Sequence, residues 1–299
     1  MIFGIVCGFT AALLNSLGYL FSARFLLYHK NPLRLLVMAT LVMQLISLPL
    51  LVIFPFGEIE NPLKFFGQML LSCMFFLIGQ GGFFAALRVF EASRLSSLLG
   101  LKIIVLSVGF VLSGGTLNIW QMAAVLMAAA AALIFNRSGS GRSSWKGWLL
   151  LLMTLCCYSS VDILETDLVL QVHETVGYSK LHSSLVVVPP MYVMLGILTM
   201  PVLFFLKPDK GQLKLAAPYA VLWLLSQVVL FCCFALLKPV FGNVILATRG
   251  IFSVLSGALL PFFGLAALDS QIPVSLWIRR GVAALLMLGA IAVYSLASM

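Results

Sequence analysis

Four ionisable side chains lie inside long apolar stretches of this chain, where charges are expensive. They are Lys102, Asp162, Glu165 and Arg249. In a stretch that crosses a bilayer, a single charged side chain costs about 2.5–3.5 kcal/mol on insertion scales. Such side chains therefore face a wet cavity, a ligand or one another. They are the first candidates for a functional site.

The acids form a pair at helical spacing. Asp162 and Glu165 are three residues apart, so one helix would present both carboxyl groups on the same face. We expect one of them to carry a coupling proton, with Glu91 as a third acid in the same role. The alternative is that these acids neutralise Lys102 or Arg249 and only hold helices together.

The cations also form a pair. Arg249 follows Lys102 by 147 residues, and Gln227 follows Gln80 by the same interval. Two cations around one cavity would suit a carboxylate or a phosphate. The alternative is that each long side chain extends to the nearest membrane surface and binds nothing.

Uncharged polar residues in the same stretches can line that cavity through hydrogen bonds, although buried glutamines also pair across helices. The predicted substrate-binding set is Lys102, Arg249, Asn15, Tyr19, Gln80, Tyr158 and Gln227. The sequence has no glycine-rich phosphate loop, no Ser/His/Asp set and no spaced Cys/His cluster. We therefore expect no enzyme activity, no cofactor and no metal. A scaffold subunit or a lipid-synthesis enzyme remains an alternative.

The elements that position these residues follow from composition. Of 299 residues, 62% are hydrophobic and only 9% are charged, with a mean hydropathy of +1.14. A soluble domain has about 25% charged residues, so most of this surface must face lipid. The apolar runs are too long and too uniform for barrel strands. Ten of them can span a bilayer: residues 3–23, 34–54, 65–87, 95–113, 118–135, 147–168, 181–206, 216–237, 243–265 and 275–297.

The basic residues set an orientation. Most loop Lys and Arg flank the odd-numbered connections, whereas the even-numbered connections hold only Lys64, Lys180 and Lys238. The positive-inside rule then predicts a multi-pass protein of the bacterial inner membrane with both termini outside. The same rule explains the net charge of +9 without nucleic acid. The expected partners are a small-molecule or lipid substrate, membrane lipids and protons, and we expect a monomer or a homodimer.

Ten helices divide into two sets of five. An odd number in each set makes the halves antiparallel, as in many transporters. The sequence therefore predicts an all-α integral membrane protein built as two inverted five-helix repeats. Residues 1–136 form the first repeat, 137–144 a cytoplasmic linker and 145–299 the second repeat.

Residues 85–135 have the pattern Ala-Leu helix end, short turn, Ser/Leu helix entry, then Gly before a helix of small residues. A second copy of this shape covers 234–257 and 278–294. In these features the chain resembles the drug/metabolite transporter superfamily, and within it the EamA-type ten-helix transporters. It departs from them at Lys102, where the family usually has proline, and at Gly114-Gly115, where the family usually has Gly-Glu.

The resemblance implies a secondary transporter that works by alternating access. In small multidrug relatives an acid of the first helix exchanges protons for drugs, which implies such a role for Asp162 or Glu165. Phosphorylated-sugar carriers of the superfamily imply an anionic or zwitterionic metabolite as substrate, held by Lys102 and Arg249. A flippase for a lipid or lipid-linked sugar is the alternative.

Overall fold

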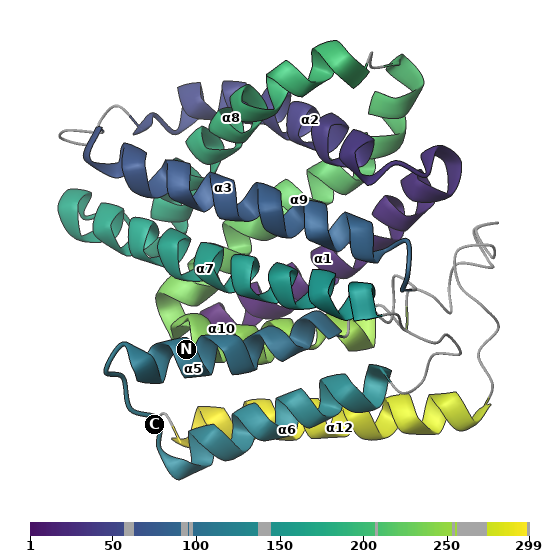
Figure 1. Ribbon diagram of the computed structural model, residues 1–299. Helices are drawn as coiled ribbons and strands as arrows, with labels where there is room; N and C mark the ends of the chain where they lie inside the picture. Colours follow the sequence, from purple (N-terminus) through teal and green to yellow (C-terminus); the bar gives the residue numbers. More distant parts are fainter. Residues whose placement is uncertain are drawn as a thin grey trace.

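The computed structural model describes residues 1–56, 63–90, 95, 98–136, 145–206, 209–252, 255 and 274–297, and this part of the chain is helical, without a strand (Figure 1). The elements are α1 (Ile2–His29), α2 (Pro32–Ile53), α3 (Leu63–Ala86), the 3-10 turn η2 (Leu99–Leu101), α5 (Lys102–Leu112), α6 (Ile119–Asn136), α7 (Trp145–Val176), α8 (Lys180–Leu206), α9 (Lys210–Leu237), α10 (Pro239–Leu246) and α12 (Val274–Ala297).

Turn residues set several helix ends. Asn31 caps α2 by accepting a hydrogen bond from the Leu33 amide at 3.0 Å, and Pro32 fills the first helical position. Gly177 adopts φ +78° just after α7, the left-handed conformation that commonly ends a helix. These short connections fold the chain back on itself, so consecutive long helices run in opposite directions.

The outside of the molecule is apolar. Val52, Leu112, Phe204 and Phe205 are each at least 82% exposed, and soluble monomers rarely show large continuous patches of this kind. Six helices are long and apolar enough to cross a membrane: α1, α2, α3, α7, α8 and α9. The chain is an all-α, multi-pass membrane protein.

The predicted spans agree with these six helices, although three helices are longer than expected. α1 continues past residue 23 to His29, α7 continues past residue 168 to Val176, and α9 begins at Lys210 instead of residue 216. The prediction used apolar residues alone, whereas the polar ends of a helix keep their backbone hydrogen bonds beyond the hydrocarbon layer. Hydropathy therefore located all six helices and underestimated the length of α1, α7 and α9.

The described residues do not contain ten helices that are each long enough to span a membrane. The other four predicted spans fall on η2 with α5, on α6, on α10 with the residues after it, and on α12, where the apolar stretches within the described residues are shorter: 99–112, 119–134, 239–252 and 281–294. The predicted spans 95–113 and 243–265 are not continuous α-helices where they are described. The first contains the 3-10 turn η2, and the second is interrupted by a turn at Ala247 and Thr248. Part of each span lies outside the described residues.

Four helix pairs make the most extensive contacts: α1 with α9, α3 with α7, α2 with α8, and α6 with α12. In Figure 1 the α2/α8 pair lies at the top and the α6/α12 pair at the bottom, with the other helices between them. Each pair joins one helix from the first half of the chain to one from the second. The buried core is therefore shared between the halves.

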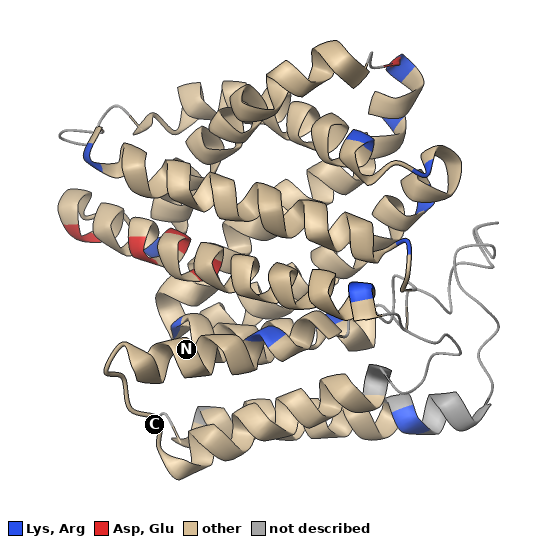
Figure 2. Ribbon diagram, in the orientation of Figure 1, with Lys and Arg blue, Asp and Glu red and all other residues tan. Residues whose placement is uncertain are grey.

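Charged residues gather at the ends of the bundle (Figure 2). Lys and Arg concentrate at the end where α1 turns into α2 and where α7 begins, on the right of the view. Both chain termini lie at the opposite end, and the acids concentrate along the second half of α7.

We expect Gly196→Ala to lower thermal stability, because α2 and α8 pack too closely there for a side chain. A Cβ at Gly196 would lie 2.3 Å from Cδ and 2.5 Å from Cβ of Gln44. Overpacking of this kind costs about 1–3 kcal/mol. Gly67→Ala is the matched control, since a Cβ there meets nothing within 4 Å. Melting of the two variants in detergent tests this, and equal melting temperatures would contradict the packing described.

Candidate functional site

A small cavity of about 20 Å³ lies in the middle of the helix bundle. That volume holds about one water molecule. Seven of the residues predicted for the site line it: Asn15, Tyr19, Lys102, Tyr158, Asp162, Gln227 and Arg249. They come from α1, α5, α7, α9 and the helical segment that follows the turn after α10, so residues from both halves of the chain meet here.

Lys102 and Asp162 form an ion pair at this cavity. Lys102 Nζ lies 2.7 Å from Asp162 Oδ2, and the two side chains are 4% and 5% exposed. Asn243 Nδ2 donates to the same carboxylate oxygen at 2.7 Å and to the Pro239 carbonyl at 2.9 Å. Asp162 is thus the counter-charge of Lys102, and the pair joins α5, α7 and α10.

Both predicted cations lie where a helix is interrupted. Lys102 is the first residue of α5, directly after η2. Arg249 follows the turn at Ala247 and Thr248, and it is 3% exposed. Interrupted helices deep in a membrane protein occur where the backbone is surrounded by protein or lines a wet cavity. Each cation directly follows one of these two interruptions, and both cations line the central cavity.

Hydrogen bonds between polar and aromatic side chains surround the cavity. Tyr158 donates its hydroxyl proton to Gln80 Oε1, and Gln80 Nε2 donates to the Tyr219 hydroxyl. Ser226 Oγ donates to Asn15 Oδ1 at 2.8 Å. Gln80 therefore does not line the cavity itself but fixes Tyr158, which does.

Glu165 lies apart from the cations. Its side chain is completely buried, and neither carboxyl oxygen has a hydrogen-bond partner among the described residues. The neighbouring groups are Ser72, Cys73 and Tyr192. An unpaired carboxylate in such a place would cost several kcal/mol, so a bound proton is the physically reasonable state. Glu91 lies outside the described residues.

Sequence reasoning missed the residues that hold the site together. Asn243 interrupts an apolar run six residues before Arg249, and that signal alone could have identified it. Trp223 lines the cavity and donates Nε1–H to the Tyr192 hydroxyl at 2.8 Å. A tryptophan in an apolar helix gives no sign of such a role.

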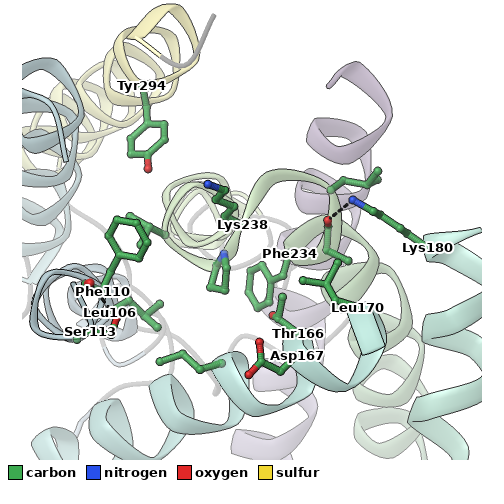
Figure 3. Close-up of a pocket in the computed structure, with 16 residues that line it drawn as sticks. Leu106, Phe110, Ser113, Thr166, Asp167, Leu170, Lys180, Phe234, Lys238 and Tyr294 are labelled. Atoms are coloured by element: carbon green, nitrogen blue, oxygen red, sulfur yellow. Dashed lines mark hydrogen bonds between the residues drawn. The ribbon is translucent and has the colours of Figure 1, made fainter. Parts of the chain in front are cut away.

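A second and larger pocket, of about 580 Å³, lies between α5, α7, α9, α10 and α12 (Figure 3). Most of its lining is apolar, and it includes Leu106, Phe110, Ile163, Leu170, Phe234 and Val240. Asp167, Lys180, Lys238 and Tyr294 add polar groups. Nothing in the sequence groups these residues, because they come from six separate helices, with Lys180 at the start of α8.

No family model matches this chain, and no curated protein matches it in sequence. The fold itself is shared with solved structures. One of them, described only as the crystal structure of a protein, aligns with a TM-score of 0.68 over 98% of this chain and 96% of its own. The two sequences are 16% identical, so the likeness extends to the fold alone.

Proposed function

We propose that this chain is a secondary transporter for a small organic solute that carries an anionic or zwitterionic group. The observation that carries the proposal is the central cavity, where Lys102, Arg249 and Asp162 are buried together in a membrane protein. Buried ionisable side chains within a membrane usually mark a substrate or ion pathway. The formal charge of the lining side chains is +1, which suits an anion.

The ion pair supplies a mechanism for substrate binding. An anionic substrate group that reaches Lys102 competes with Asp162 for the same ammonium. Asp162 keeps its hydrogen bond from Asn243 and can accept a proton once the ammonium has left. Glu165 lies one helical turn further along α7 and is a second group that can hold a proton. Substrate and proton binding are then coupled through one helix.

The helix packing supports two inverted five-helix repeats. If the halves are equivalent, exchange of the first half for the second turns the α1/α9 contact into the α7/α3 contact. The same exchange leaves the α2/α8 and α6/α12 contacts unchanged. These four are the most extensive contacts in the described residues. Ten membrane passes in total, the shorter helices included, fit this arrangement.

Alternating access follows from such a fold. The small cavity lies where the halves meet, and rocking of one half against the other would open it to each side in turn. The basic end of the bundle in Figure 2 then faces the cytoplasm of a bacterial cell. Both termini lie on the outer side of the inner membrane.

A flippase for a lipid or lipid-linked sugar is the second candidate. The 580 Å³ pocket favours it, because most of its lining is apolar. Ile163 lines the pocket and is 42% exposed, so the pocket offers apolar surface to the acyl chain of a lipid.

Removal of either central cation should abolish transport. We expect Lys102→Ala or Arg249→Ala to lower the uptake of organic anions into proteoliposomes at least about tenfold, because a hydrogen bond to a charged group contributes about 1.5–3 kcal/mol. A panel of sugar phosphates and carboxylates serves as substrate. Lys64→Ala, at the exposed start of α3, is the control and should transport normally. Full uptake by the Lys102→Ala, Arg249→Ala double variant would refute the proposal.

The effects of substitutions at Lys102 and Asp162 on thermal stability should also depend on each other. Lys102→Met alone removes the cation in contact with the buried Asp162 carboxylate and should cost about 3–5 kcal/mol. The double variant Lys102→Met, Asp162→Leu should recover most of the loss, because apolar replacement of a buried pair is often neutral. Thermal melting in detergent measures stability, and uptake measures function. Recovered stability with recovered uptake would mean that the pair only holds helices together.

The topology can be tested with fusions after Met299. Since we place this terminus outside, an alkaline phosphatase fusion should be active in a bacterial host and a green fluorescent protein fusion should stay dark. A fusion after Gly141, in the proposed cytoplasmic linker, should give the reverse result. Bright fluorescence after Met299 would overturn the orientation.

A further inference from the structure

We infer that the pocket between α5, α7, α9, α10 and α12 binds one amphipathic organic anion, with Lys238 as the partner of its charged head. The inference rests on the proposed function and names the class of substrate. No residue of the predicted site lines this pocket, so it is a second binding place that the central cavity does not include.

The size and lining of the pocket fit a molecule with an apolar body. Its volume of about 580 Å³ lies within the range of about 300–1,000 Å³ that holds drug-sized ligands. Leu106, Phe110 and Val240 form part of an apolar wall. Gly109, on the same helix as Leu106, leaves open space, since a Cβ there would meet nothing within 4 Å.

The polar groups favour an anionic head. Lys180 and Lys238 line the pocket with Asp167, so the formal charge of the lining is +1. Lys180 donates one proton to the Ala235 carbonyl at 2.7 Å, which holds the start of α8 against the end of α9. Lys238 is exposed, and Figure 3 shows its ammonium on the same side of the pocket as the Tyr294 hydroxyl.

The backbone at Lys238 is the second, independent observation. This residue has φ 67° and ψ 154°, in a region of backbone space that is essentially reserved for glycine. Pro239 follows it, and a residue before proline normally has a negative φ. A lysine therefore occupies a position where glycine would be less strained. Strain of this kind is concentrated at ligand clamps and active sites.

The pocket and the central cavity lie on either side of one layer of side chains. On α5, Leu106 of the pocket lies one turn beyond Lys102 of the cavity. On α10, Asn243 lies between Pro239, which lines the pocket, and Leu246, which lines the cavity. The Lys102–Asp162–Asn243 contacts thus separate the two spaces. A molecule bound at Lys238 would therefore be separated from the central cavity by that layer.

The pocket also borders the lipid-facing surface. Ile163 and Leu236 line it and are 42% and 36% exposed, and Val108 and Leu112 on α5 are 53% and 82% exposed. The apolar wall of the pocket on α5 thus belongs to a helix that also faces lipid. This placement favours an amphipathic anion over a fully hydrophilic one.

The test is equilibrium binding of radiolabelled dodecyl phosphate to the full chain in phosphatidylcholine nanodiscs. We expect saturable binding of one molecule per chain. Lys238→Gly should weaken binding at least tenfold while the melting temperature stays equal or rises, because glycine relieves the strained backbone. Gly109→Leu should also weaken binding at least tenfold, because its side chain would extend into the open space of the pocket.

Two matched controls separate the pocket from general effects. Lys30 is the other non-glycine residue with positive φ in the described residues, at 49°, and it lies at the far end of α1. Lys30→Gly and Gly67→Leu should both bind as the wild type does. Inorganic phosphate should compete weakly, because it has the head without the body, and so should dodecanol, which has the body without the charge.

Several results would overturn the inference: no saturable binding to the wild type, wild-type affinity in Lys238→Gly or Gly109→Leu, or inorganic phosphate as strong a competitor as dodecyl phosphate. None of them depends on uptake. If binding fails while Lys102→Ala still abolishes uptake of hydrophilic anions, only this inference fails. If binding holds while the central variants transport normally, the proposed function fails and the pocket remains.

Discussion

The structure depends on the cost of placing charge among apolar helices. Lys102 and Asp162 are almost completely buried, and either charge alone would destabilise the fold by several kcal/mol. They must therefore lie against each other, and this fixes the start of α5 beside the middle of α7. Asn243 adds α10 to the same contact. One electrostatic requirement thus positions three helices from both halves of the chain.

The same requirement makes this layer suitable for a switch. A tightly packed apolar interface has no reason to separate, whereas an ion pair separates without loss if another anion or a proton takes over one partner. The central cavity on one side is almost filled, and the pocket on the other side is open. A ligand that changes the partner of Lys102 would shift the balance between these two arrangements by its differential affinity for them.

Much of the site could be predicted from the sequence. The part that could not be predicted depends on how the helices pack against one another. Charges in apolar stretches identified Lys102, Arg249 and Asp162, because lipid excludes them from any other surroundings. Helical spacing also placed Asp162 and Glu165 on one face, yet only Asp162 reaches the cavity. Three residues still differ by about 60° around a helix of 3.6 residues per turn, which is enough to face a different neighbour. Which neighbour that is depends on packing, and the positions of Asn243 and of the residues that line the larger pocket depend on packing in the same way.

Two residues lower the stability of this fold in ways that packing does not explain. Glu165 is buried without a hydrogen-bond partner, and Lys238 holds a backbone conformation suited to glycine, which costs about 1–3 kcal/mol. Proteins are stable by only about 5–15 kcal/mol, so each cost is a sizeable fraction of the total. Neither is needed to close the bundle, since an apolar residue at 165 and a glycine at 238 would serve the fold better. Glu165 lies one turn from Asp162 on α7 and is suited to a proton, whereas Lys238 lines the larger pocket and is suited to an anion. Their retention is explained if each residue binds a ligand that the protein transports.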